Sequence, residues 1–572
     1  MKKSTFTIIF LTICIAIYAR QTSVSTASAI NSGSWSAGDT IIMKNGTWTN
    51  QSILFKATGT VDQPVVLMAE TSGSVILTGT SKLGFSGKYV VISGLYFRNG
   101  TLSGSDVISF RYSSSDLAQN CRLTNCAIDS YNPADNTVDS KWVSLYGINN
   151  QVDHCSFVNK NNSGTLLVVW LVNGTTVNHV IADNYFGYRN SNLDTTGAEL
   201  NGQEIIRVGD SGTSMTVANV IVKNNFFEHC NGEIETISNK SCGNLYSNNV
   251  FLECHGMLTL RHGNNCTVDG NYFFGNGVAS SGGVRIIGEN HKIYNNYFDN
   301  LRGTDYRAAL CIVRGKLNSL ANEYFQVKNA VVEFNTFVNC TQAFKINYNS
   351  SSSLTLPPIG TVIAHNHVYN TSASNTNVNI DLTNSTGMDV TWKNNFMNQG
   401  KYNNFSYSSI QVITGMDAKM TLTGITINMF EPGAGSELAN YTTSENADVL
   451  YDIRGRDRGT VKLPGCSQLT GTISRAMPVK SEVGAGFYNN PSTAISTIVE
   501  PIDFKVYQIN NKIVAETSQA GNIYVYDNSG KLLNSNSITT GSISFMINQK
   551  GVYILVFKSV SGNKVSRKIS LS

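Results

Sequence analysis

Asn225-Phe226-Phe227 is followed along the chain by Asn249-Val250-Phe251, Asn271-Tyr272-Phe273 and Asn296-Tyr297-Phe298, and the last aromatic residue returns after 24, 22 and 25 residues. A period in the low twenties, broken by insertions, is typical of the coils of a parallel β-helix. The regular leucines of a leucine-rich repeat and the Trp-Asp signature of a propeller are missing from the sequence. Looser copies extend the repeat at Leu95-Tyr96-Phe97, Cys155-Ser156-Phe157, Asn184-Tyr185-Phe186, Asn335-Thr336-Phe337 and Asn395-Phe396-Met397.

We therefore predict an all-β fold dominated by a right-handed parallel β-helix, or solenoid, over about residues 22–487. Each coil would contribute short strands whose inward side chains stack on the same position of the next coil. Asn suits the corners between strands, because it tolerates left-handed backbone and can hydrogen-bond along a stack. The longer steps, 41 residues from Phe186 to Phe227 and 39 from Phe298 to Phe337, predict loops that leave the cylinder and wall a groove.

The two ends of the chain differ from the repeat. Lys2 and Lys3 precede an apolar stretch that is too short to span a bilayer, which is typical of a signal peptide. No other stretch approaches the roughly 18 apolar residues of a membrane helix, so we expect no membrane span. The sequence divides into a signal peptide (1–19), the β-helix (20–490), a linker (491–501) and a C-terminal domain (502–572).

The last ~70 residues predict a small C-terminal β-sandwich, because alternating strands are separated by polar turns. The stretches Asn522–Asp527, Ser529–Lys531 and Lys550–Tyr553 resemble the C-terminal sorting domains of the Bacteroidetes type IX secretion system. This resemblance implies outer-membrane secretion machinery as a partner. It also implies a secreted, cell-surface or periplasmic protein of a Gram-negative bacterium. A carbohydrate-binding module and a stabilising cap are the alternatives for this domain.

The overall charge says little about partners. The chain has 42 basic and 38 acidic residues, and removing residues 1–20 leaves 39 basic against 38 acidic residues. A nearly neutral protein gives no reason to expect nucleic acid, and attraction to a polyanion must be local. Ten of the 11 cysteines lie outside the signal peptide and show no zinc-binding spacing. We interpret them as small apolar residues that stack in the repeat, ahead of disulfides.

One segment, Asn231–Lys240, departs from the repeat. Glu233 and Glu235 are two residues apart, so on a strand they would share a face. Two such carboxylates would repel each other unless a cation lay between them, and calcium prefers several oxygen ligands. Asn201 and Glu204, plausibly one coil earlier, could complete the site.

A pair of basic residues accompanies these carboxylates. Lys240 and Arg261 are 21 residues apart, which is close to one coil, so they should lie side by side on adjacent rungs. The alternative is a surface ladder of ion pairs among Glu233, Glu235, Lys240 and Arg261 without a ligand.

This constellation resembles polysaccharide lyase family 6, which includes alginate lyases and chondroitinase B. The resemblance extends from about Val24 to the Val483–Gly486 stretch, and its motifs are long and correctly ordered. The matching stretches are Asn201–Glu204, Asn231–Ser241, Leu260–Gly263 and Gly283–Gly288.

The family resemblance implies a calcium-assisted β-elimination. It places Ca²⁺ on Asn201, Glu204, Glu233 and Glu235. It makes Lys240 the general base and Arg261 the residue that acts as, or assists, the general acid. His262 and Arg285 would bind substrate carboxylates, with Tyr348 on the far side of the subsite. Lys240 must be neutral to accept a proton, and Ca²⁺ together with Arg261 is expected to depress its pKa.

The predicted substrate is alginate, at mannuronate-containing linkages, and the product carries a 4,5-unsaturated uronate end. A chondroitin or dermatan sulfate lyase of the same family is the first alternative. A polygalacturonase-like hydrolase would need a pair of aspartates at the coil corners and would leave Lys240 without a role. A non-catalytic, glycan-binding β-helix surface protein is the remaining alternative.

Overall fold

The computed structural model describes residues 19–489 and 504–571, apart from gaps at 103, 194–196, 198, 373–375, 409–410, 416, 424–426, 447, 510–511, 528–531, 548 and 560–563. The predicted linker and all but the last residue of the predicted signal peptide lie outside the described residues. The chain forms two compact units, one up to Pro491 and one from Ser492. Within the described ranges, no helix has the length and apolar character needed to cross a membrane.

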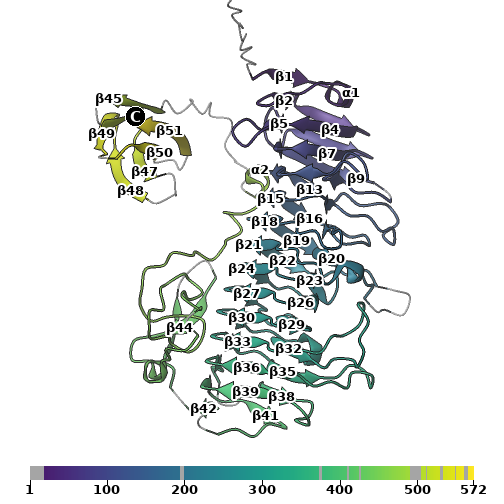
Figure 1. The fold of residues 1–572 in the computed structure, drawn as a ribbon, viewed down its shortest axis with the longest axis vertical. Helices are drawn as coiled ribbons and strands as arrows, with labels where there is room; N and C mark the ends of the chain where they lie inside the picture. Colours follow the sequence, from purple (N-terminus) through teal and green to yellow (C-terminus); the bar gives the residue numbers. More distant parts are fainter. Residues whose placement is uncertain are drawn as a thin grey trace, which may run out of the picture. The chain divides into compact units, whose positions relative to one another are not determined.

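The first unit is the predicted parallel β-helix. Its strands form three parallel sheets of 14 strands each, and the chain passes from sheet to sheet in every coil (Figure 1). Sheet 1 contains β1 (Gln21–Val24), β2 (Thr40–Met43), β5 (Val65–Ala69), β8 (Val90–Ser93), β12 (Arg122–Thr124), β15 (Gln151–Asp153), β18 (Val180–Ala182), β21 (Ile221–Lys223), β24 (Leu245–Ser247), β27 (Thr267–Asp269), β30 (Lys292–Tyr294), β33 (Val331–Glu333), β36 (Thr361–Ala364) and β39 (Val390–Lys393).

The strands of the other two sheets are also parallel. Sheet 2 contains β3 (Gly46–Thr49), β6 (Val75–Gly79), β9 (Leu95–Gly100), β13 (Ala127–Asp129), β16 (Ser156–Val158), β19 (Tyr185–Arg189), β22 (Phe226–Cys230), β25 (Val250–Leu252), β28 (Tyr272–Phe274), β31 (Tyr297–Asp299), β34 (Thr336–Val338), β37 (His367–Tyr369), β40 (Asn395–Met397) and β42 (Val412–Thr414). Sheet 3 contains β4 (Ser52–Thr58), β7 (Lys82–Lys88), β10 (Ile108–Ser109), β11 (Ala118–Gln119), β14 (Val143–Leu145), β17 (Leu167–Val169), β20 (Ile206–Gly209), β23 (Glu235–Lys240), β26 (Met257–His262), β29 (Val284–Ile286), β32 (Leu310–Val313), β35 (Gln342–Tyr348), β38 (Val378–Leu382) and β41 (Lys401–Asn403). The short helix α1 (Ala27–Asn31) packs against β4 near the first coils.

The repeated Asn forms a buried ladder at the corner before sheet 2. The Oδ1 atom of each Asn accepts hydrogen bonds from the backbone N and from Nδ2 of the Asn one coil earlier, at 2.9–3.1 Å. Because every amide is fully buried, each of these hydrogen bonds fixes the register of one coil on the next. The ladder residues are Asn184, Asn225, Asn249, Asn271, Asn296, Asn335, Asn366 and Asn395.

The left-handed backbone that we assigned to the same Asn lies instead on the residue before it. Asn224, Asn248 and Asn295 have φ values of 54–58°, and Phe334 and His365 adopt the same conformation at φ 55°. The turn and the side-chain ladder are therefore divided between neighbouring residues. Our prediction assigned both properties to one position.

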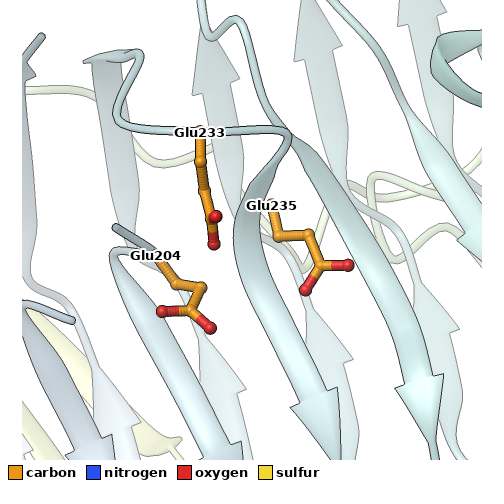
Figure 2. Close-up of side chains that lie close together, drawn as sticks. All are labelled: Glu204, Glu233 and Glu235. Atoms are coloured by element: carbon orange, nitrogen blue, oxygen red, sulfur yellow. The ribbon is translucent and has the colours of Figure 1, made fainter. Parts of the chain in front are cut away.

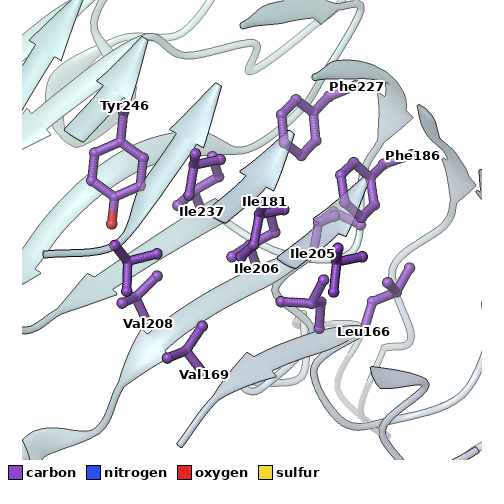
Figure 3. Packing of buried hydrophobic residues seen from close by; sticks show 14 of the residues in the cluster. Leu166, Val169, Ile181, Phe186, Ile205, Ile206, Val208, Phe227, Ile237 and Tyr246 are labelled. Atoms are coloured by element: carbon purple, nitrogen blue, oxygen red, sulfur yellow. The ribbon is translucent and has the colours of Figure 1, made fainter. Parts of the chain in front are cut away.

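Inside the coils, the aromatic residue of the motif stacks on its counterpart in the next coil. Ring centroids along the series from Phe157 to Phe337 are 4.5–5.3 Å apart, and the planes are within 21° of parallel. Aliphatic side chains from sheets 1 and 3 fill the space beside Phe186 and Phe227 (Figure 3). The resulting core is continuous along the solenoid.

The cysteines belong to this packing. All ten described cysteines are buried and unpaired, which agrees with the interpretation as structural thiols. Cys155 donates its backbone N–H to Asn184 Oδ1 at 2.9 Å. It therefore occupies, one coil earlier, the position that an Asn occupies in the later coils.

The parallel strands stop at β42, earlier than the predicted end at residue 487. The described residues between 415 and 489 form a return segment, which contains the antiparallel strands β43 (Met420–Thr423) and β44 (Met429–Pro432), then η3 (Glu437–Tyr441) and, at its end, α2 (Gly486–Asn489). It lies along the outside of the solenoid (Figure 1). This part of the chain lacks the Asn-aromatic period because it makes no coil.

The return segment contacts successively earlier coils. The backbone N of Gly465 donates to His365 O, Arg475 pairs with Asp269, and the N of Gly484 donates to Asp183 O, each at 2.8 Å. Its apolar side chains pack on the outer side of sheet 2, in a cluster that includes Ile453, Cys466, Met477, Tyr185, Phe226 and Tyr272.

The second unit is a small antiparallel domain with its own core. One sheet has the order β45 (Phe504–Ile509), β46 (Lys512–Thr517) and β49 (Gly541–Met546). The other has the order β48 (Leu532–Ile538), β47 (Gly521–Asp527), β50 (Gly551–Ser559) and β51 (Lys564–Leu571). Ile513, Ile523, Val525, Leu555 and Phe557 are fully buried in its core, as expected for the predicted β-sandwich.

The ladder predicts a large stability effect for a single amide. Asn271→Ala leaves the backbone N–H of Asn249 without its acceptor and removes one hydrogen bond each from Asn249 Nδ2, Asn296 Oδ1 and the Tyr246 carbonyl, all in the core. We therefore expect a loss of about 3–5 kcal/mol in unfolding free energy. The urea-unfolding midpoint measures this loss. The exposed Asn161→Ala variant is the control, and equal losses in both variants would contradict a special role for the ladder.

A buried histidine makes the stability depend on pH. Burial lowers the pKa of His367 to about 4, against an ordinary value of about 6.5. Between these values the unfolded chain binds a proton that the folded chain does not. The free energy of unfolding therefore falls as pH falls through this window, by up to about 1.4 kcal/mol per pH unit. His367→Gln should show a correspondingly shallower loss of stability between pH 6.5 and pH 4 in urea titrations. An unchanged slope would overturn this assignment.

Candidate active site

Four neighbouring strands of sheet 3 carry most of the predicted site. β20, β23, β26 and β29 pair in parallel, in this order. Ile237 and Asn239 of β23 are buried inside the coil, whereas Ser238 and Lys240 alternate with them on the outer face. The site is therefore built on the outside of the most regular part of the fold.

A β-bulge in β23 turns Glu235 to this outer face. Glu235 pairs with Met257 and Ile237 pairs with Leu258, so Thr236 is an extra residue in the ladder. Without it, Glu235 would have the same orientation as Ile237 and would enter the core. Glu233 lies in the turn before β23 and not on the strand. The two carboxylates thus share a face as predicted, but through a turn and a bulge.

Three predicted ligands form a buried carboxylate cluster. Oxygen atoms of Glu204, Glu233 and Glu235 all lie within 4.8 Å of one another (Figure 2). Thr165 Oγ1 donates to Glu204 Oε2 at 2.6 Å, and the backbone N of Gly202 donates to Glu233 Oε2 at 3.2 Å. Asn201, the fourth predicted ligand, has an exposed side chain. The structure brings the three glutamates together, and Asn201 as a ligand stays a prediction.

The cluster has an excess of negative charge. Burial, followed by repulsion from Glu204 and Glu235, raises the pKa of Glu233 to about 9. Arg189 lies beneath the cluster, but its Nη atoms bind the backbone oxygens of Glu204, Asn162 and Gly164. Several carboxylate oxygens with incomplete charge compensation are a donor set that fits a hard divalent cation such as Ca²⁺.

Arg285 touches the same cluster. Its guanidinium pairs with Glu235, and both side chains are buried. In this arrangement Arg285 supplies part of the missing positive charge. The predicted substrate-binding residue therefore lies directly beside a predicted ligand.

A second bulge places Arg261 and His262 together. Asn239 pairs with Leu260, but Lys240 pairs with His262, so Arg261 is the extra residue in β26. The predicted proximity of Lys240 and Arg261 on adjacent rungs is correct, although the Cα partner of Lys240 is His262. A bulge lets two consecutive side chains share one face, and Arg261 Nη1 lies 3.4 Å from His262 Nδ1. Lys240 Nζ lies 3.6 Å from Glu204 Oε1.

A loop between β32 and β33 holds Arg261. Its guanidinium donates to the backbone oxygens of Glu323, at 2.7 Å, and Asn322, at 3.3 Å. It also lies over the ring of Tyr324, 4.3 Å from the centroid. The sequence predicted a loop here from the long step to Phe337 but did not single out Tyr324, because nothing local links it to a residue 63 positions earlier.

His262 is a neutral group in this site. Burial, and then the charges of Arg261 and Lys240, lower its pKa to about 3. Its Nε2 lies 3.2 Å from Ser211 Oγ. A neutral imidazole can donate one hydrogen bond to a substrate carboxylate but cannot pair with it as a cation.

Tyr348 borders a cavity on the side of Arg285. The cavity measures about 190 Å³ and is lined mainly by Arg285, Tyr306, Tyr324 and Tyr348. Tyr306 and Tyr324 were not predicted from the sequence, because they lie in the long insertion and carry no repeat motif. Aromatic walls beside an arginine suit a sugar acid.

Comparison with known proteins places this geometry in a family. The chondroitinase B family profile matches residues 24–445. A solved PL6 family alginate lyase, AlyGC, is 32% identical, with a TM-score of 0.69 over 82% of this chain. The chain belongs to polysaccharide lyase family 6.

Two other structures of family 6 lyases are similar to this family 6 protein. A mannuronic acid specific lyase from human gut microbiota is 28% identical, with a TM-score of 0.59, covering 68% of this chain and 89% of that one. The lyase Pedsa3628 from Pseudopedobacter saltans is 27% identical, with a TM-score of 0.56, covering 68% and 94%. The match to AlyGC spans 59% of the length of that protein. No curated protein matches the chain.

Family membership and fold are thus confirmed, while the roles of single residues in this family 6 protein stay predictions.

The carboxylate cluster can be tested directly by substitution. In chelator, Glu233→Gln should be at least as stable as the parent, because a neutral amide removes repulsion among buried charges. Millimolar Ca²⁺ should then stabilise the parent by about 2.7 kcal/mol at a hundredfold excess over Kd, and the variant by much less. Thermal unfolding measures both effects.

The control for this test is Glu70→Gln, which alters an ion pair with Lys44 far from the cluster in sequence. It should keep the full response to Ca²⁺. An equal response of the parent and Glu233→Gln would show that the three glutamates do not form the cation site.

Proposed function

We propose that this family 6 protein cleaves alginate by calcium-assisted β-elimination, at mannuronate-containing linkages, and leaves a 4,5-unsaturated uronate end. The observation that carries the proposal is the position of Lys240, with Nζ 3.6 Å from a carboxylate oxygen of the buried Glu204, Glu233 and Glu235 cluster. A group that can take a proton thus lies beside oxygen atoms suited to a divalent cation.

The three glutamates would hold the calcium ion, with Asn201 as a fourth ligand from the adjacent loop. Bound calcium would neutralise the uronate carboxylate, which makes the C5 proton easier to remove. Lys240 accepts that proton as a neutral amine. A cation held by Glu204 would occupy the carboxylate that Lys240 now contacts, which leaves the amine free to face the substrate.

The neighbouring residues would orient the sugar and assist its departure. Arg261 remains charged and is held by the Asn322 and Glu323 carbonyls, so it can steady the oxygen that leaves C4, even where water delivers the proton. His262 would donate one hydrogen bond to a carboxylate. Arg285 would bind a second carboxylate, and Tyr348 would line the cavity beside it.

Two relatives support alginate as the substrate. AlyGC is an alginate lyase, and the lyase from human gut microbiota is specific for mannuronic acid. The first alternative is a chondroitin or dermatan sulfate lyase, because the matching profile is named for chondroitinase B. The second is a β-helix that binds glycans without cutting them.

The C-terminal unit would serve export. Its two antiparallel sheets enclose a separate core, which suits a module recognised by secretion machinery. Together with the predicted signal peptide, it supports a secreted or cell-surface location, with the periplasm as the alternative, in a Gram-negative bacterium. A substrate on the outside of the cell agrees with that location.

The activity is tested by the absorbance of the unsaturated uronate. Purified protein should release it from alginate, and more from polymannuronate than from polyguluronate or dermatan sulfate. Chelator should abolish the release and added Ca²⁺ should restore it. Lys240→Ala should lower kcat by about 10²–10⁴, the range for loss of a general base.

Lys223→Ala, at an exposed position of β21, is the control and should retain full activity. If no uronate polymer yields an unsaturated product, the proposed lyase activity is refuted. Activity that resists chelation would refute only the role of calcium. Activity confined to dermatan sulfate would favour the first alternative.

A further inference from the structure

The outer face of sheet 3 continues beyond Lys240 toward the earlier coils. Gly209 of β20 pairs with Lys240, and Val169 of β17 pairs with Val208, so Trp170 precedes Gly209 in the same column. Leu145 of β14 pairs with Val169, which places Tyr146 one coil before Trp170. Gly209 has no side chain, and the Leu171 side chain packs at this position, so the surface between Trp170 and Lys240 is apolar along this column.

Arginines flank the two aromatic rings. The rings of Tyr146 and Trp170 are stacked, with centroids 5.9 Å apart and planes at 9°. The Arg111 guanidinium lies over Tyr146, 4.1 Å from its centroid, and Arg207 lies over Trp170 at 5.4 Å. This arrangement presents two fixed positive charges on the same face as Lys240.

These two arginines have no directly contacting acidic partner among the described residues, and Asp106 acts on Arg111 only over a longer distance. Neither forms an ion pair within 4.0 Å, whereas Arg285, Arg307 and Arg456 are paired with glutamates or aspartates. Arg207 Nε is buried and has no hydrogen-bond partner in the described part of the chain. Guanidinium groups without a direct ion pair point to an anionic ligand.

A cavity of about 440 Å³ adjoins Arg111. Arg111, Tyr146 and Trp170 line it together with apolar residues such as Leu171 and polar residues such as Gln119 and Thr175. None of its described lining residues is acidic. We call it the Arg111 cavity. An arginine, two aromatic rings and several hydrogen-bonding groups are suited to a sugar that carries a carboxylate.

We propose that the Arg111 cavity binds a uronate residue of the same polysaccharide chain that Lys240 attacks. This inference rests on the proposed function, because it takes the chain to be a polyuronate. With each rung of the sheet advancing by about 4.8 Å, Trp170 and Tyr146 lie about 10 and 14 Å from Lys240 along the solenoid. That is a distance of a few sugar units.

The consequence concerns where the chain is cut. The cavity lined by Arg285 and Tyr348 lies beside β29, and the Arg111 cavity lies beside β14 and β17. Lys240 is on β23, which lies between these strands in the order of the sheet. A polysaccharide that fills both cavities extends on both sides of the cleaved bond. The Arg111 cavity therefore makes the enzyme favour long chains and cut them internally.

Binding without turnover tests the proposal. In the full-length Lys240→Ala protein, calorimetry with saturated mannuronate hexasaccharide and disaccharide should show that Arg111→Ala weakens hexasaccharide binding about tenfold. This is the typical effect of one lost hydrogen bond to a charged group. Trp170→Ala should have a similar effect, and Trp170→Phe a smaller one. Disaccharide binding should change less than twofold.

The matched control is Tyr188→Ala, which removes an exposed aromatic ring on sheet 2. It should bind both ligands as the parent does. Cellohexaose, a neutral chain, should not distinguish Arg111→Ala from the parent. Thermal unfolding identifies any variant that has lost its fold. If Arg111→Ala does not fold, the hexasaccharide affinity of the milder variant Arg111→Gln is compared with that of the parent.

The proposal is overturned if Arg111→Ala and Arg111→Gln are folded and bind the hexasaccharide with an affinity within twofold of that of the parent. In the active background, the same variants should shift the early products of polymannuronate from long to short fragments. If the parent, which keeps Lys240, binds the hexasaccharide but forms no unsaturated product, the elimination chemistry is refuted. The proposal that the Arg111 cavity binds a uronate is unaffected by that result. The two failures are therefore distinguishable.

Discussion

The buried amide ladder is the interaction on which the rest of this structure depends. Each Asn of the ladder binds the backbone and side chain of the one before it, from Asn184 to Asn395, and none of these groups can reach water. A coil out of register would leave buried donors and acceptors without partners, a cost that accumulates with every rung. Insertions are consequently confined to loops between strands, as in the steps before Phe227 and Phe337.

This strict register explains how residues far apart in sequence meet on one face. Lys240, His262 and Arg285 lie on three consecutive strands of sheet 3, and Glu204 lies just before the preceding strand, β20. The site also needs two β-bulges, at which side chains no longer alternate regularly between the inner and outer faces of the sheet. Extra residues at Thr236 and Arg261 turn Glu235 outward and bring Arg261 beside His262. Both bulges occur where β23 meets β26, the pair of strands that carries Lys240.

Much of this could be predicted because the repeat is visible in the sequence. The period located the coils, and the 21-residue spacing correctly placed Lys240 and Arg261 on adjacent rungs. The reason given for Glu233 and Glu235 was only partly correct, since Glu233 precedes the strand and a bulge reorients Glu235. Neither bulge has a local sequence signal. Tyr324 and the Arg111 cavity escaped prediction because they depend on contacts between distant loops and rungs. The return segment escaped prediction because it has no repeat.

The return segment changes how the solenoid can come apart. A stack of coils with only nearest-neighbour contacts can fray from either end, one rung at a time. Here residues 465–484 bind coils in reverse order, from His365 back to Asp183, so the last part of the unit is tied to its middle. Separation of the terminal coil must then also detach this segment from several rungs at once. The return segment thus turns a one-dimensional array into a single cooperative body.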